Sequence, residues 1–167
     1  MPIRIDNLPT YYTQVVTVAK SGGDYTTITA AHAAITDATT SKRYCVLVYP
    51  GTYSEAITMK DYVDIDGSGW WNTIIQQNDA IIVTPDSNCM LKNIGLDLAN
   101  PTAARNVVDS NASLSDFSIE DCKITMANAF DYYGIALYGA TLTDVYLRRI
   151  IIDSSAETEY VMSWYSA

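Results

Sequence analysis

The sequence predicts an all-β fold, a single-stranded right-handed parallel β-helix of about five coils with an N-terminal capping α-helix. Two observations lead to this prediction. From residue 44 onward, short β-rich runs such as YCVLVY, AIIVT and EYVMSW are separated by Gly, Asn, Asp, Ser and Pro. Within this region LKNIGL, LSDFSI and LTDVYL share a Leu-x-(Asn/Asp)-apolar-x-apolar pattern at unequal spacing. A solenoid produces such spacing when one turn of each coil carries insertions of variable length.

The repeat gives each of its residues a predicted place in the coil. Three leucines are expected to stack inward: Leu91, Leu114 and Leu142. Three polar residues are expected to align at one sharp bend as a structural turn ladder: Asn93, Asp116 and Asp144. Asn and Asp tolerate the left-handed backbone conformation that a tight bend requires. An acidic active-site row is the alternative interpretation of these three positions.

The rest of the chain is predicted to divide into three parts. Residues 1–14 form an irregular N-terminal arm, residues 15–43 hold a strand and the capping helix, and residues 44–167 form the β-helix. The strand is expected at 15–18. Between Thr27 and about Ala38 apolar residues recur at three- and four-residue spacing, which predicts a helix with Thr26 or Thr27 as N-cap.

Composition and charge exclude several classes of function. Hydrophobic residues make up 49 % of the chain and charged residues 17 %, with a net charge of −9. Such an acidic chain is not expected to bind nucleic acid or anionic membranes, because phosphate groups demand Lys and Arg. No apolar stretch approaches the roughly 18 residues that span a bilayer, and the N-terminus lacks the apolar region of a signal peptide.

The residue types that carry most catalytic and metal chemistry are few. Cys45, Cys89 and Cys122 stand at wide spacings, so we expect reduced, buried thiols rather than disulfides or a zinc site. The single histidine, His32, lies inside the expected helix, and no nucleophile motif such as GxSxG occurs. No metal and no cofactor are therefore expected.

Three segments carry a resemblance to a known family. VVTVAKSGGDYTTITAAHAAI, YCVLVYPGTYSEAI and VDIDGSGWWNTII resemble the N-terminal portion of the pectin lyase-like superfamily, above all the pectinesterase group. This resemblance implies the β-helix fold. Pectinesterases act through paired aspartates, an arginine and glutamines in motifs resembling QAVFL, DFIFG and LGRPW, and none of these motifs is present here. We therefore expect the fold without the family's catalytic residues.

Charged residues in the β region have mainly structural interpretations. Asp61, Asp64 and Asp66 predict an acidic strand face exposed to solvent, with calcium binding or glycosidase-type acid–base chemistry as alternatives. Pectate lyases need a basic residue near a carboxylate calcium cluster. Arg148 and Arg149 are adjacent on a predicted strand, so they are expected to point to opposite faces and not to act as one patch.

Aromatic residues are the candidate contact residues. Trp70 and Trp71 fall in a predicted turn, and Tyr132 and Tyr133 precede a strand. Exposed aromatic pairs anchor protein interfaces or stack on sugar rings, and we favour an interface over sugar binding or local packing. The arm residues are further candidates for contact with a larger partner: Arg4, Tyr11 and Tyr12.

A short acidic β-helix with an arm and no catalytic set resembles the accessory proteins of viruses and phages. Tailspikes, fibres and capsid-decoration proteins reuse this fold, commonly as trimers. The expected function is a non-enzymatic virion structural protein, most concretely a trimeric capsid decoration or cement protein, or a tail or fibre module. Its expected partners are further copies of itself, the major capsid or another virion protein, and a surface polysaccharide. It is expected in the virion after synthesis in the host cytoplasm.

Two other functions remain open. One is a polysaccharide-binding or polysaccharide-degrading β-helix like a tailspike, which the aromatic pairs would support by stacking on sugar rings. The other is a pectinesterase-like carbohydrate esterase, which the missing motifs disfavour.

Overall fold

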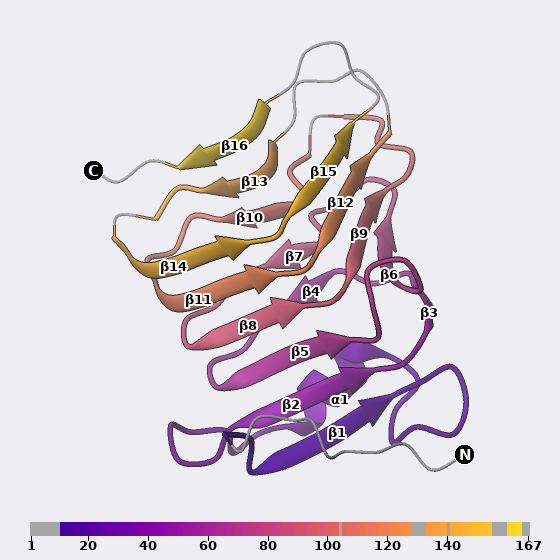
Figure 1. Ribbon diagram of the computed structural model, residues 1–167, viewed down its shortest axis with the longest axis vertical. Coiled ribbons are helices and arrows are strands. Elements are labelled where there is room, and N and C mark those ends of the chain that lie inside the picture. Colours follow the sequence, from indigo (N-terminus) through magenta and orange to yellow (C-terminus); the bar gives the residue numbers. More distant parts are fainter. Residues whose placement is uncertain (1–10, 104, 128–132, 140, 155–159, 165–167) are drawn as a thin grey trace.

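The computed structural model describes residues 11–103, 105–127, 133–139, 141–154 and 160–164. In these residues the chain forms the predicted right-handed parallel β-helix, with five coils stacked along the long axis (Figure 1). Each coil contributes one strand to each of three sheets, and neighbouring coils pair in parallel. Among the described residues, no helix is long and apolar enough to cross a membrane.

The three sheets run the length of the stack. The six-stranded sheet contains β1 (Gln14–Val18), β2 (Tyr44–Val48), β5 (Val63–Gly67), β8 (Cys89–Lys92), β11 (Leu114–Glu120) and β14 (Leu142–Arg148). The second sheet contains β3 (Gly51–Tyr53), β6 (Thr73–Gln77), β9 (Gly95–Leu98), β12 (Lys123–Met126) and β15 (Ile151–Ser154). The third sheet contains β4 (Ile57–Thr58), β7 (Val83–Thr84), β10 (Val108–Ser110), β13 (Tyr133–Leu137) and β16 (Tyr160–Trp164).

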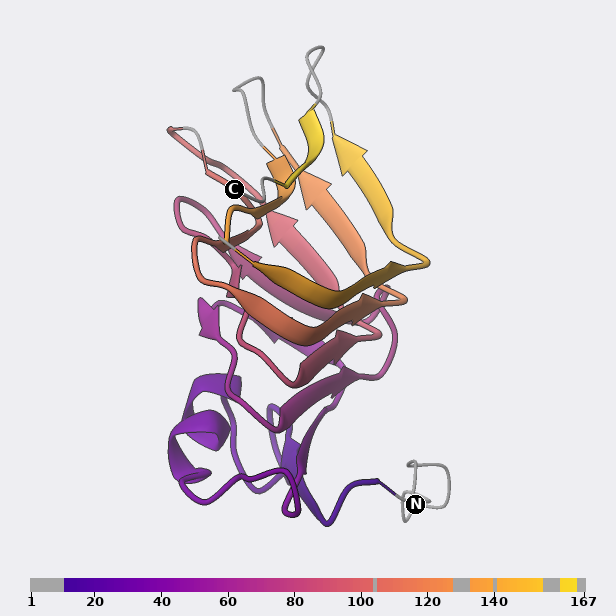
Figure 2. The ribbon, with the colours of Figure 1, turned by 90° about the vertical axis from the view of Figure 1, so that its left-hand side faces the viewer.

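One short helix lies on the first coil. Helix α1 spans Ile28–Ala34 and is shorter than the sequence predicted, because Ile35 already has an extended backbone. Thr27 is its N-cap and accepts a hydrogen bond from the Ala30 amide. At its C-terminal end, Lys60 Nζ donates to the carbonyl oxygens of His32 and Ile35, each at 2.7 Å, and so satisfies groups that a helix end leaves unpaired. Figure 2 shows the helix at the N-terminal end of the stack.

The strand register corrects the predicted alignment of the repeat. Leu91 is paired with Ile119, and Ile119 with Leu147, so equivalent positions in these coils are 28 residues apart. Leu114 is paired with Leu142, as predicted, but neither lies beside Leu91. The prediction that all three leucines stack on one another is therefore wrong.

Left-handed residues occur at two bends rather than one. One row precedes the strands of the six-stranded sheet or lies near their start: Tyr62, Asn88, Asp116 and Asp144. The other row follows those strands: Asn93, Asp121 and Arg149. Hydrogen bonds connect neighbouring coils within each row, as from the Asn88 amide to Ser115 O at 2.8 Å and from the Asn93 amide to Glu120 O at 3.1 Å.

All three residues of the predicted turn ladder do have the left-handed conformation. Asn93, however, lies at the opposite end of the sheet from Asp116 and Asp144, so they do not align at one bend. The prediction failed because the same local chemistry serves both bends.

The interior is apolar from the helix to the fourth coil. Isoleucine, leucine, valine and phenylalanine side chains point inward from all three sheets, and most are fully buried. In the fifth coil the inward-facing residues are only partly buried: Leu142, Val145, Leu147, Ile150 and Ile152.

Candidate functional site

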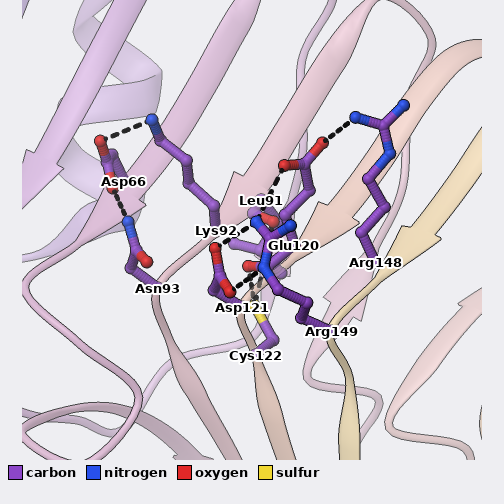
Figure 3. Close-up of polar contacts among 9 residues, drawn as sticks. All are labelled: Asp66, Leu91, Lys92, Asn93, Glu120, Asp121, Cys122, Arg148 and Arg149. Atoms are coloured by element: carbon purple, nitrogen blue, oxygen red, sulfur yellow. Dashed lines mark hydrogen bonds and ion pairs between the residues drawn. The ribbon is translucent and has the colours of Figure 1, made fainter.

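A row of alternating charges runs across the outer face of the six-stranded sheet. Because side chains alternate along a strand, one outward position of each coil falls in the same row. From β5 to β14 this row contains, in order, Asp66, Lys92, Glu120 and Arg148 (Figure 3). Lys92 Nζ lies 3.0 Å from Asp66 Oδ2, and Arg148 Nη1 lies 3.5 Å from Glu120 Oε1. The row is therefore internally neutralised.

Residues of the adjacent bend complete this charge row. Asn93 Nδ2 donates to Asp66 Oδ1 at 2.7 Å, and Arg149 Nη2 donates to Asp121 Oδ2 at 2.6 Å. Arg149 Nη2 also lies 3.7 Å from Glu120 Oε2. The hydrogen bond from Arg149 holds the pKa of the Asp121 carboxyl below its usual range.

The two arginines of the fifth coil correct a prediction. Arg148 and Arg149 were expected to point to opposite faces, but both contact Glu120. Arg149 has a φ of 51°, so strand alternation has already ended at that residue. These two residues do act as one basic patch, and Glu120 neutralises it.

The predicted acidic strand face is covered rather than solvated. Asp64 is 0 % exposed and Asp66 is also buried. Asp64 Oδ1 accepts hydrogen bonds from the Met90 amide at 2.8 Å and from Arg43 Nη2 at 3.2 Å. The Arg43 guanidinium lies over the Tyr11 ring, 4.4 Å from its centroid. Asp61 lies outside this face and accepts from Asn88 Nδ2 at 3.1 Å.

Burial governs the protonation of the Asp64 region. Removal from water raises the pKa of the Asp64 carboxyl, although its hydrogen bonds and the Arg43 charge act in the opposite direction. Burial, and then the charge of Asp64, raise the pKa of the Tyr12 hydroxyl. Arg43 and the two tyrosines thus keep the Asp64 carboxyl out of contact with solvent.

The arm residues are placed only in part. Tyr11 and Tyr12 have tilted rings with centroids 5.1 Å apart, beside Arg43 of the same chain. Arg4 and Tyr132 lie outside the described residues. Tyr133 begins β13, and its ring is edge-on to that of Tyr138.

A polar hollow of about 550 Å³ lies beside β10 on the third sheet. It is lined by Asp79, Ala80, Ile81, Arg105, Asn106, Asp109 and Tyr133. Thr102 donates to both carboxylate oxygens of Asp79, which holds its pKa below the usual range. Asp109 Oδ2 accepts from Asn106 Nδ2 at 3.1 Å. Asp79 thus stays ionised at neutral pH, fixed by its two hydrogen bonds from Thr102.

The cysteines and the histidine are buried, as predicted for the cysteines. Burial raises the pKa of the Cys45 and Cys122 thiols to about 12 and also raises that of Cys89, so all three stay protonated at neutral pH. Burial lowers the pKa of His32 to about 4. Within the described ranges, no three His, Cys, Asp or Glu residues are placed to hold a metal ion.

Trp70 and Trp71 border a second, smaller hollow. They lie in the turn before β6, as predicted, with centroids 5.5 Å apart and ring planes at 86°. The hollow measures about 250 Å³ and reaches Asp97, Lys123 and Thr125 on the outer face of the second sheet. Trp71 is 66 % exposed, which is the largest exposure among the large hydrophobic residues that the structure describes.

Several of these site residues were not predicted from the sequence. Arg43 precedes β2 without any motif, and nothing in its local sequence predicts its contact with Asp64. Lys92, Glu120 and Arg148 were recoverable, because outward positions alternate with apolar ones in their strands. Lys123 beside Trp70 depends on the register between coils, which the repeat did not predict correctly.

Comparisons with known proteins agree with the fold. No protein-family model and no curated protein sequence matches the chain. Among solved structures, it resembles a pectin methylesterase mutant in complex with a hexasaccharide, with a TM-score of 0.51 and 12 % identity over 90 % of this chain and 68 % of the other. Pectin methylesterase PemA from Erwinia chrysanthemi gives a TM-score of 0.46 at 14 % identity, over 84 % of this chain and 67 % of the other. The likeness at a TM-score of 0.51 shows that the chain shares the parallel β-helix fold of this pectin methylesterase, and at 12 % identity it shows the fold alone.

Proposed function

We propose that the chain is a non-catalytic structural protein of a virus particle, a trimeric capsid-decoration protein or a tail or fibre module. The virion setting rests on the analogy between a short acidic β-helix and the β-helical accessory proteins of phages. Its non-catalytic character is supported by the carboxylates of the six-stranded sheet. Asp64, Asp66 and Glu120 are each engaged by a basic side chain.

The observation that carries self-association is the fifth coil. Its inward-facing apolar residues are partly exposed, and its outer faces present Tyr146 at 45 % and Ile151 at 47 % exposure. Strands β14, β15 and β16 are the outermost of their sheets, and outermost strands offer backbone groups for pairing.

Charge also favours contact through this coil. Across residues 141–154 the acidic and basic residues balance: Asp144, Asp153, Arg148 and Arg149. The chain as a whole carries −9, so repulsion between copies is weakest where the fifth coils meet. The proposed partners at the fifth coil are a second and a third copy of the chain.

The mass in solution tests self-association. Light scattering at micromolar concentration is expected to give three times the 18.4 kDa of one chain. Ile151→Asp places a charge on the proposed contact and should shift the protein toward monomer, while Trp71→Asp places the same charge on the second coil and should not. A wild-type monomer at every concentration, or equal effects of both substitutions, contradicts contact through the fifth coil.

Two further experiments test the virion role and the absence of catalysis. Antibodies against the chain should detect it in particles purified from a culture that carries its gene, and protein that stays in the particle-free supernatant contradicts the role. Purified protein should not release methanol from esterified pectin. Methanol release by the wild-type protein that is lost in Asp64→Asn or Asp109→Asn would contradict the absence of catalysis and support a pectinesterase-like activity.

A further inference from the structure

The hollow beside Trp70 and Trp71 has the construction of a ligand site. Gly69 has a φ of 120°, and a Cβ there would lie 2.8 Å from Trp71 Cζ2, so the indole packs directly on this glycine. A Cβ at Gly95 would lie 2.6 Å from Trp70 O, so Gly95 allows the tryptophan turn to lie close to β9. Trp70 meets Trp71 edge to face. The exposed Trp71 indole thus packs on Gly69 and against the Trp70 ring, while Gly95 lets this turn lie close to β9.

Polar side chains stand beside this indole platform. In the second sheet, Gln76, Asp97 and Thr125 fall in one outward row, and Lys123 falls in the neighbouring row. Gln76 Nε2 donates to Asp97 Oδ2 at 3.0 Å, which fixes both side chains while leaving their other oxygens available. Lys123 Nζ lies 5.6 Å from the centroid of Trp70. Amide, carboxylate, hydroxyl and ammonium groups at fixed positions next to an aromatic ring match the hydroxyls and the apolar face of a sugar.

We propose that this hollow binds a hexopyranose ring of a neutral polysaccharide. The ring stacks on Trp71, and its hydroxyls bond Asp97, Lys123 and Thr125, which line the hollow. At about 250 Å³ the hollow is smaller than the roughly 300–1,000 Å³ of sites for drug-sized ligands, so it fits one ring. Sugar binding here goes beyond the proposed structural role and does not depend on self-association.

The local charge selects a neutral sugar over a uronate. Lys123 is already paired with Asp153, with Nζ 3.0 Å from Oδ2, so Asp97 leaves the site with a net negative charge. The chain as a whole carries −9, which repels polyanions on approach. A protein partner is the other candidate for exposed tryptophans, but a small hollow that combines an indole ring with Asp97, Lys123 and Thr125 favours a sugar.

Affinity electrophoresis tests the site with named probes. Dextran, laminarin, galactomannan and mannan serve as neutral polymers, and polygalacturonate serves as the anionic one. At least one neutral polymer is expected to retard the wild-type protein, and polygalacturonate is not. Trp71→Ala should weaken that binding by about tenfold or more, as loss of a tryptophan anchor does.

Matched variants separate the site from general effects. Trp71→Phe keeps a ring and should retain part of the binding, and Gly69→Ala should weaken binding because it displaces the ring without removing it. Tyr138→Ala removes an exposed ring just after β13, away from this hollow, and should leave binding unchanged. Circular dichroism confirms that each variant is folded. The proposal is overturned if no neutral polymer binds, if binding survives Trp71→Ala, or if polygalacturonate binds in preference to the neutral polymers.

Discussion

At the N-terminal end of the β-helix, helix α1 and strand β1 lie on the first coil, and its inward residues Val46 and Val48 are fully buried. In the fifth coil Leu147, which is in register with Val46 through Ile65, Leu91 and Ile119, remains partly exposed. The ion pairs differ in the same way: Asp64 beside the first coil is buried under Arg43, whereas the Glu120–Arg148 pair reaches solvent. Among the described residues, the helix end of this repeated architecture is thus the more buried (the closed end) and the fifth coil the less buried (the open end). The fifth coil is the surface proposed for contact with another copy.

The largest difference is expected between the two arginines. Arg43→Met leaves the buried Asp64 carboxylate without its charged partner and should lower the free energy of unfolding by about 3–5 kcal/mol. Arg148→Met breaks a solvent-exposed pair and should cost about 0–1 kcal/mol. Urea denaturation of both variants at low protein concentration gives the two values. Equal costs would mean that the two ends do not differ in burial as described.

Two leucines on one interior row sharpen the comparison. Leu91→Ala removes a fully buried side chain and should cost about 2–5 kcal/mol. Leu147, connected to Leu91 through Ile119, is only partly buried, so Leu147→Ala should cost less than half as much in the monomer. Repeating the urea measurement under assembling conditions should raise the cost at Leu147 alone. An unchanged cost there contradicts burial of the fifth coil on assembly.

Histidine makes the closed end sensitive to acid. The pKa of His32 is lowered to about 4, so between pH 6.5 and 4 the unfolded chain binds a proton that the folded chain does not. Stability therefore falls as the pH drops through this window, and His32 contributes about 2–4 kcal/mol of that loss. His32→Leu should remove this part, which appears as the difference between the two stability–pH curves. Wild-type and His32→Leu stability curves that run parallel from pH 6.5 to 4 would contradict this contribution of His32.

The smallest difference between the two ends is expected from the contact that holds the start of α1 to the first coil and from an exposed ion pair of the fifth coil. Glu55 accepts hydrogen bonds from the Ile28 amide at 3.1 Å, from the Thr29 amide at 2.8 Å and from the Thr29 hydroxyl at 2.7 Å. Glu55→Gln keeps the shape but removes the charge and should cost about 1 kcal/mol. Asp153→Asn, at an exposed pair of the fifth coil, should change the melting temperature less. A larger effect of Asp153→Asn than of Glu55→Gln would contradict the greater burial of the helix end.

Sequence patterns predicted the fold class, but not the alignment of the coils. Turn residues and β-rich runs are local signals. The turn at Trp70 was predicted correctly, and the N-cap, predicted as Thr26 or Thr27, is Thr27. The repeat pattern wrongly aligned the start of β11 with the end of β8, because Asp116 and Asn93 have the same left-handed conformation at different bends. Only backbone pairing between coils distinguishes the two.

The site residues were predictable only where they were local. The Trp70–Trp71 pair is adjacent in sequence, so it was found, but its polar neighbours Asp97 and Lys123 come from two other coils. Burial of Asp64 depends on Arg43, 21 residues earlier, and on the tyrosines beside it. Arg149 departs from strand geometry because of a bend that arginine rarely adopts, and no composition signal marks it.

Hydrogen–deuterium exchange at two protein concentrations tests most directly whether the fifth coil is the contact surface. Backbone amides of residues 142–154 should exchange rapidly in dilute protein and become protected at high concentration, because their edge strands gain partners. Amides of residues 44–67, next to the helix, should be protected equally at both concentrations. Exchange in residues 142–154 that does not depend on concentration, while the protein is oligomeric, would contradict contact through the fifth coil.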